Sequence, residues 1–198
     1  MRFKRRRGGR IEADVPATEV AVLGQVVAEL LALLSAGDDA PVDADPLEAL
    51  VGLPPGEVRR PEEPGLRRLF PDAYRDDAFT SSGRSDPQTA AAEASSDFRR
   101  YTEADLRAGK RANADVVLAT LAPLAGGGRL VLDRDQADAW LGTLNDLRLV
   151  LGVHLEVAED VPEQPFADDD PRAFAVEVFR WLGWLQETLL ECLEPRSP

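Results

Sequence analysis

"AWLGTLNDLRLVLGVHLEV", residues 139–157, is the stretch that decides the fold, because its apolar residues repeat with the period of a helix. Trp140, Leu144, Leu147 and Leu151 recur at intervals of three and four residues, which places them on one helical face. An apolar face of this width has to be buried against other elements of the chain. The stretch therefore predicts a core helix and a mainly helical fold around it.

Three polar residues, Asn145, Asp146 and Arg148, stand beside this apolar face. An arginine flanked by apolar residues is expected to be half-buried, and such a guanidinium favours a carboxylate in bidentate geometry. The candidate partners are Asp146 and Glu187, which lies in the last helix. We interpret these residues as a polar tie between two packed helices. The alternative is a ligand-binding or catalytic pocket on the face of Asn145 and Arg148, which an open hollow beside an unpaired Arg148 would favour.

The same apolar periodicity predicts three more long helices, at 16–35, 103–123 and 171–193, beside the helix at 134–153. A capping-box pattern at Thr102 sets the start of the second of these helices. The four helices are expected to form one core. The side chains expected to face it include Leu106, Trp140, Leu144, Leu147, Phe174, Trp181 and Leu185.

The N-terminal residues 2–15 predict a β-hairpin, because both halves alternate and a pair of glycines between them suits a tight turn with positive φ. The alternation turns the arginines outward and puts the apolar residues on one buried face. A short third strand is expected at 129–133, followed by a capping box of Asp133 and Gln136. The residues of the buried face are Phe3, Ile11, Ala13 and Val15.

The length of 198 residues and a hydrophobic content of 44% predict a single domain over residues 1–198. Its fold class is mainly α: a helical bundle with a small N-terminal hairpin. Three segments are rich in Pro, Gly and small polar residues, and we expect them to be loop-rich or mobile. These segments are 37–65, 78–97 and 157–171.

The net charge of −13 gives the protein a field that repels nucleic acid and anionic membranes. Residues 2–10 differ from this acidic average, because they carry six positive charges and no negative one. This basic tip has three interpretations: a contact with the protein's own acidic body, with a protein partner, or with nucleic-acid phosphate. A second basic cluster lies at 99–110. The candidate partner-binding residues are Arg2, Lys4, Arg5, Arg6, Arg7, Arg10, Arg99, Arg100, Arg107 and Lys110.

Cys192 is the one cysteine of the chain, which excludes an intramolecular disulfide and fits a reducing, cytoplasmic compartment. Near the end of an amphipathic helix it is either a small buried hydrophobe or, if exposed, a redox candidate for an intermolecular disulfide. The neighbouring Glu191 and Glu194 are expected to raise the pKa of its thiol. The longest apolar run, 20–34, is short and interrupted by polar residues, so no membrane segment is expected.

The sequence motifs of catalysis are missing. His154 is the single histidine, so no Ser–His–Asp constellation has a spare candidate. The glycines at 126–128 are not followed by the Lys-Ser/Thr of a phosphate loop. The acidic clusters lack the spacing of a calcium loop. We therefore expect no enzymatic activity, no metal and no cofactor.

Five segments in this order resemble an actinobacterial family known as a domain of unknown function, whose genes lie beside that of the Clp-protease adaptor ClpS. These segments are "RGGRIEADV", "LRRLFPDAYRDD", "FRRYTEADLRAGKRANADVVLATL", "AWLGTLNDLRLVLGVHLEV" and "RWLGWLQETLLECL". The family includes AosR-like oxidative-stress transcription regulators, and the resemblance covers nearly the whole chain.

This resemblance implies a cytoplasmic, non-enzymatic regulator that acts by protein–protein contact in a transcriptional stress response. The implied partner is a sigma factor or another part of the transcription machinery. Redox sensing of the AosR type is linked with a cysteine pair, whereas this chain has only Cys192. Direct DNA binding through the basic tip remains a weaker alternative, and a homodimer formed through the first or the last helix is a further one.

Overall fold

A computed structural model describes residues 1–36, 60–74, 87–156 and 172–194. Within these ranges the chain forms five α-helices and one three-stranded antiparallel sheet, so the predicted mainly helical fold class is confirmed. The elements are β1 (Lys4–Arg5), β2 (Ile11–Val15), α1 (Ala17–Ser35), α3 (Pro64–Leu69), α4 (Pro87–Leu121), β3 (Gly128–Leu132), α5 (Arg134–His154) and α6 (Arg172–Leu193), with 3-10 turns at Arg7–Gly9 and Ala122–Leu124.

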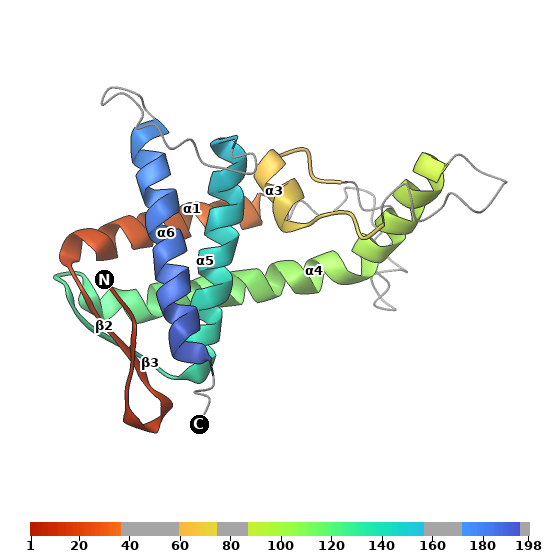
Figure 1. The fold of residues 1–198 in the computed structure, drawn as a ribbon. Helices are drawn as coiled ribbons and strands as arrows, with labels where there is room; N and C mark the ends of the chain where they lie inside the picture. The colour runs from red at the N-terminus through yellow and green to blue at the C-terminus, as the bar shows by residue number, and fades with distance from the viewer. Residues whose placement is uncertain (37–59, 75–86, 157–171, 195–198) are drawn as a thin grey trace.

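The helices pack in two crossed pairs (Figure 1). α5 and α6 lie side by side, while α1 and α4 run across behind them in opposite directions. The N-terminal end of α4 projects away from the bundle, and the short α3 lies against one end of α5. The hairpin and β3 form the sheet at the opposite end. The contacts between these helices position the polar side chains of the candidate site.

The sheet has the order β1-β2-β3, so β2 is its central strand and the predicted third strand is confirmed. Arg5 pairs with Ile11, which leaves a five-residue connection with a 3-10 turn instead of the tight turn expected. Both glycines of this connection have a φ of +80°, as predicted. All four apolar residues expected on the inner face of the hairpin are buried.

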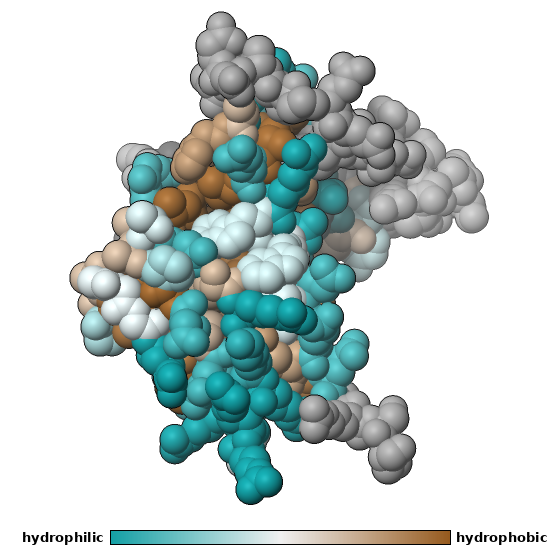
Figure 2. All heavy atoms as spheres, turned by 60° about the vertical axis from the view of Figure 1, so that its left-hand side comes forward, coloured by the Kyte–Doolittle hydropathy of each residue, from teal (hydrophilic) through white to brown (hydrophobic). Residues whose placement is uncertain are grey.

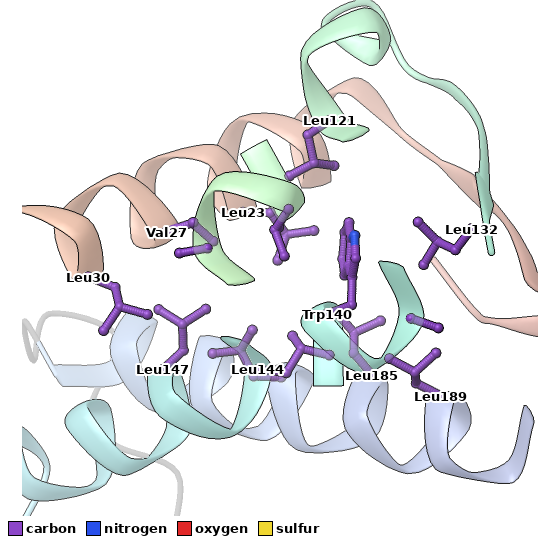
Figure 3. Close-up of a cluster of buried hydrophobic side chains, with 14 of the residues drawn as sticks. Leu23, Val27, Leu30, Leu121, Leu132, Trp140, Leu144, Leu147, Leu185 and Leu189 are labelled. Carbon is purple, nitrogen blue, oxygen red and sulfur yellow. The ribbon is translucent and has the colours of Figure 1, made fainter. Parts of the chain in front are cut away.

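The core lies where α1, α4, α5, α6 and β3 converge (Figure 3). Trp140 is fully buried at its centre, and its indole nitrogen donates to Thr120 Oγ1 at 3.0 Å. Phe3 meets its ring edge-on, with 5.7 Å between the ring centres. This hydrogen bond lets the largest side chain of the core be buried without a stranded polar group. Leu144, Leu147 and Leu185 are buried around it, as predicted.

The sequence prediction was wrong about the start of α4. The helix begins at Pro87, so residues 87–97 are helical rather than loop-like, and the hydroxyl of Thr102 donates within the helix to the Phe98 carbonyl at 2.8 Å rather than capping it. Proline at a first helical position loses no hydrogen bond, and the alanines that follow have the highest helix propensity. Of the other residues expected to be loop-rich, 37–59, 78–86 and 157–171 lie outside the described residues.

Three side chains expected in the core lie at its edge or outside it. Trp181 is only partly buried, while its neighbour Leu182 is fully buried. Leu106 and Phe174 are 51% and 63% exposed. Consecutive residues of α6 point in directions about 100° apart, so the face that carries Val178 and Leu182 is not the face of Phe174 and Trp181. The buried stripe of α6 runs through Val178 and Leu182.

The helix α1 is more apolar than a surface helix requires. By length and composition alone it could cross a membrane, although the core helix of a globular protein meets the same criteria. It packs against α4 and α5. The side chains that it buries are Val20, Leu23, Val27, Leu30 and Leu34.

Candidate functional site

Two arginines of α4 close the C-terminal end of α1. Leu34 carries one of the last carbonyl groups of that helix, which have no partner inside the helix. Arg107 Nη1 and Arg111 Nη2 donate to this oxygen at 2.8 and 2.7 Å. Positive charge here also opposes the negative end of the helix dipole. These two guanidinium groups therefore hold α1 to α4.

Two of the predicted partner-binding arginines form internal ion pairs. Arg107 Nη2 lies 2.6 Å from Glu103 Oε1, and its guanidinium carbon is 4.6 Å from the centre of the Phe70 ring. Arg99 Nη1 lies 2.7 Å from Asp72 Oδ1. Both arginines are at most 7% exposed. The structure therefore corrects the expectation that Arg99 and Arg107 present their charges to a partner, because these side chains already have carboxylate partners inside the protein.

Lys110 is engaged in the same way, since its Nζ donates to Asp146 Oδ1 at 2.7 Å and joins α4 to α5. The polar tie at Asp146 thus runs to Lys110, not to Arg148 as expected. Burial raises the pKa of the Asp146 carboxyl, and the hydrogen bond and charge of Lys110 offset part of that rise. Arg100 is half-buried, and its guanidinium carbon lies 5.7 Å from the centre of the Tyr101 ring.

Arg148 joins α5 to α6, but not through the residue predicted. Its Nη1 donates to Gln186 Oε1 at 2.6 Å, and its guanidinium carbon lies 5.2 Å from the centre of the Phe179 ring. Glu187 is exposed. Consecutive residues of a helix point in directions about 100° apart, so Gln186 faces Arg148 and Glu187 does not. Gly183 completes this face of α6, where an added Cβ would lie 3.4 Å from Arg148 Nε. The tie therefore uses an amide oxygen in place of a carboxylate.

An open hollow of about 530 Å³ lies beside this arginine, between α3, α5 and α6. We call it the arginine hollow. Arg68, Asn145, Arg148, Glu156 and Phe179 line it, with apolar residues of α5 between them. A second hollow, of about 490 Å³, shares Arg68 and one valine with the first and is continuous with α3. The two hollows therefore adjoin each other at Arg68 and Val153.

The charge of the arginine hollow is not neutralised by the part of the chain that the structure describes. There, Arg148 has no carboxylate oxygen within 4.0 Å, and its Nε is buried with no hydrogen-bond partner. Arg68 is exposed and makes no ion pair or side-chain hydrogen bond with another described residue. A partly buried guanidinium without a counter-ion favours the approach of an anion, and its remaining donors suit one. This arrangement favours the ligand-binding alternative.

The basic tip is partly tied to the protein's own body. Arg5 Nη1 donates to the Glu194 carbonyl at 2.9 Å, Arg6 Nε lies 3.0 Å from Glu12 Oε2, and Arg2 lies 3.8 Å from a carboxylate of α6. Figure 2 shows hydrophilic side chains gathered at the lower end of the molecule, where Figure 1 places the hairpin. The exposed basic side chains of the tip with neither an ion pair nor a side-chain hydrogen bond to another described residue are Lys4, Arg7 and Arg10.

Cys192 is buried near the C-terminal end of α6, with 7% of its surface exposed. Burial is the main cause that raises the pKa of its thiol, and the charge of Glu191 adds to it. A hydrogen bond from the backbone of Arg5 and the charges of Arg5 and Arg2 act in the opposite direction. The thiol is therefore shielded and protonated at neutral pH, which is the environment of an unreactive cysteine.

Within residues 1–36, 60–74, 87–156 and 172–194, no group of three or more His, Cys, Asp or Glu side chains could hold a metal ion. His154 is exposed, with its Nδ1 2.9 Å from the Val150 carbonyl and its Nε2 4.0 Å from Glu63 Oε1. No nucleophile lies within hydrogen-bond reach of this ring among the described residues. The arginine hollow therefore offers binding chemistry rather than the parts of a catalytic triad.

These features define a helical protein with a shielded thiol, an internal network of arginines and an open cationic hollow. A family model described as a domain of unknown function, DUF2017, matches residues 1–193, and the chain belongs to this family. Among curated proteins, it is 35% identical over 193 residues to the oxidative stress regulator AosR of Mycobacterium tuberculosis (strain H37Rv), covering 96% of this chain and 84% of the relative. The oxidative stress regulator AosR of Mycobacterium bovis is similar to the same extent.

No solved structure matches the chain significantly. The curated relatives are named as regulators rather than as enzymes. That naming agrees with the regulatory role that the family resemblance implied.

Proposed function

We propose that this protein is a non-enzymatic regulator of the AosR-like type, which acts on a transcriptional stress response through protein–protein contact. The observation that carries the proposal is the likeness to named oxidative stress regulators over 96% of the chain. The proposed partner is a sigma factor or another part of the transcription machinery, and the proposed location is the cytoplasm. We also expect the gene to lie beside that of ClpS.

The free cations of the hairpin support a contact with a protein. Lys4, Arg7 and Arg10 extend from an otherwise acidic molecule and leave a small, one-signed surface at the tip. A net charge of −13 opposes the approach of nucleic acid, whereas a protein can match its charge pattern to both the tip and the body. We propose α1 as a core helix and not a membrane anchor, because its leucines pack against α4 and α5.

The shielded thiol bears on how the regulator would sense oxidants. An intermolecular disulfide is the one disulfide that Cys192 can form, and burial opposes it. We therefore propose that this member responds through its partner contact rather than through an internal disulfide.

Light scattering of the purified protein mixed with RNA polymerase, with and without a stress-responsive sigma factor, tests the proposal. We expect a complex of defined stoichiometry, and we expect replacement of Lys4, Arg7 and Arg10 by Gln to weaken it. Arg134→Gln is the matched control, because this exposed arginine lies on α5, outside the tip. Failure to form any complex would contradict the proposal. Binding to duplex DNA alone, lost in the hairpin variant, would support the DNA-binding alternative instead.

A further inference from the structure

The arginine hollow differs from the other arginine sites of the protein in one respect. Arg99 and Arg107 are each matched by a carboxylate inside the structure, at 2.7 and 2.6 Å. Arg148 is also partly buried, yet among the described residues its Nη1 meets only the amide oxygen of Gln186, and no carboxylate oxygen lies within 4.0 Å. Its buried Nε has no acceptor there, but the same holds for Arg99 Nε, so the missing carboxylate is what distinguishes Arg148. No described carboxylate neutralises this guanidinium, which leaves its charge available to an anionic partner.

The second free charge of the hollow comes from another element. Arg68 lies on α3, and its side chain lines both adjoining hollows without an ion pair to a described residue. Asn145 adds an exposed amide on the same wall as Arg148. The lining also holds one carboxylate, Glu156, which makes no ion pair with Arg148. Among the described residues, two guanidinium groups and an amide thus line one open space together with one acidic group.

The shape of the site indicates the kind of ligand. Pockets for small molecules enclose most of the ligand. Here the hollow is open, and it adjoins a second one of similar size that is lined by Arg60 and Arg67 of the α3 region. Arg60 is paired with Asp72 at 3.2 Å, and Arg67 Nη2 donates to the Glu62 carbonyl at 2.8 Å. Arg68 and Arg148 are the arginines that line the arginine hollow itself, and neither has a carboxylate partner among the described residues. A track of this form suits an extended chain better than a compact molecule.

We propose that the arginine hollow binds a carboxylate side chain of an acidic segment of a partner protein, with Arg148 and Arg68 as its two cationic contacts. This inference rests on the proposed function, because it supplies the chemistry of the partner contact. Carboxylates match the fork of a guanidinium group, and the Phe179 ring holds the guanidinium of Arg148 in place from one side. The net charge of −13 opposes an acidic segment as it opposes nucleic acid, but at physiological salt this repulsion is largely screened beyond about 8 Å. Binding therefore depends on the local contacts of the carboxylate with Arg148 and Arg68.

The test uses fluorescence anisotropy of a dye-labelled, end-capped octaglutamate peptide with the full chain at about 150 mM salt. Each lost charge-assisted contact is expected to weaken binding about tenfold. We therefore expect Arg148→Gln and Arg68→Gln each to weaken the peptide by that factor. Arg129→Gln, which alters a 65% exposed arginine of β3, is the matched control and should leave affinity unchanged within twofold.

Further arms separate the other sources of binding. Octaglutamine is expected not to bind, and glutarate and inorganic phosphate are expected to compete only weakly. If glutarate or phosphate displaced the peptide completely at a concentration equal to that of the peptide, the hollow would be a site for a small anion. That result would overturn the inference. The inference would also be overturned if the double variant Arg7→Gln/Arg10→Gln lost binding while Arg148→Gln and Arg68→Gln kept wild-type affinity. The peptide would then bind to the hairpin and not to the arginine hollow.

Because Arg148 also packs against α6, its variant is checked by thermal unfolding, and the exposed Arg68 provides the independent result. The same two variants are then added to the light-scattering assay with RNA polymerase. A complex that forms normally with both variants would refute the role of the hollow and leave the proposed function intact. Specific peptide binding without any polymerase complex would refute the proposed function and leave the site intact.

Discussion

The pair Arg107–Glu103 provides the sharpest test of the fold, because its removal leaves a buried charge behind. Arg107→Met keeps the stem of the side chain and deletes the group that lies 2.6 Å from Glu103 Oε1. Glu103 is 9% exposed, and its other carboxylate oxygen already has no hydrogen-bond partner. The carbonyl of Leu34 keeps its bond from Arg111 at 2.7 Å. The dominant loss is therefore the uncompensated carboxylate.

Breaking a buried ion pair in this way costs about 3–5 kcal/mol. For a chain of this length 1 kcal/mol corresponds to roughly 2–4 °C in Tm, so we expect Tm to fall by about 10 °C in thermal unfolding followed by circular dichroism. Glu103→Met/Arg107→Met should be more stable than Arg107→Met alone, because the stranded charge is gone.

The matched control is Arg134→Met in α5. Arg134 also forms an ion pair with the residue four positions on, Asp138, at 2.9 Å, and also donates to a carbonyl near a helix end, that of Leu193. The side chains of this pair are 63% and 50% exposed, so its loss should cost less than about 1 kcal/mol. Equal losses of stability in Arg107→Met and Arg134→Met would refute the reasoning that burial gives the first pair its weight.

Because the pKa of Asp146 is raised, the folded state binds a proton at this carboxyl more tightly than the unfolded state does. In urea unfolding, the wild type should therefore gain stability relative to Asp146→Asn as the pH falls from neutral through that pKa. A stability difference that does not change with pH would contradict the raised pKa. Cys192 should react with iodoacetamide at pH 7.5 at least tenfold more slowly in the native protein than in urea, and mild peroxide should leave the light-scattering mass unchanged. A reductant-reversible doubling of mass, absent in Cys192→Ser, would show that the thiol is accessible. Gly127→Ala should destabilise the protein by about 1–3 kcal/mol, since its φ is +82° and a Cβ would lie 2.9 Å from a backbone nitrogen at the start of α1. Gly126→Ala, with nothing within 4 Å of its Cβ, should be neutral in the same urea titration.

The sequence was most informative where burial follows apolar periodicity. The helices α1, α5 and α6 and the inner face of the hairpin were predicted because Leu, Val and Trp recur at the spacing that their packing requires. The first half of α4 was missed because its buried stripe is not apolar. That stripe recurs every four residues and consists of Ala91, Ser95, Arg99, Glu103 and Arg107. A search for period-four repeats that admits small and oppositely charged residues would have found it.

The candidate site was predictable only in part for a similar reason. Arg148 stood out because it interrupts an apolar face, but its partner was assigned by charge to Glu187, whereas helix geometry turns Gln186 toward α5. Phe179, Gly183 and Gln186 share one face of α6 by their spacing, and this was the available signal. Arg68 had no signal, since it joins the hollow through the packing of α3, which is a property of the tertiary structure.

The central position of β2 has a consequence for the order of events during synthesis. Ile11 pairs with Leu132, and β1 packs against the C-terminal part of α6, so the hairpin depends on elements made much later for its contacts. The Leu34 carbonyl likewise has to remain without its hydrogen bonds from Arg107 and Arg111 until α4 has been made. Contacts of such long range slow folding relative to bundles of neighbouring helices. We therefore expect residues 1–36 of the nascent chain to remain unprotected against proteases until α6 has left the ribosome, and to become protected in one step.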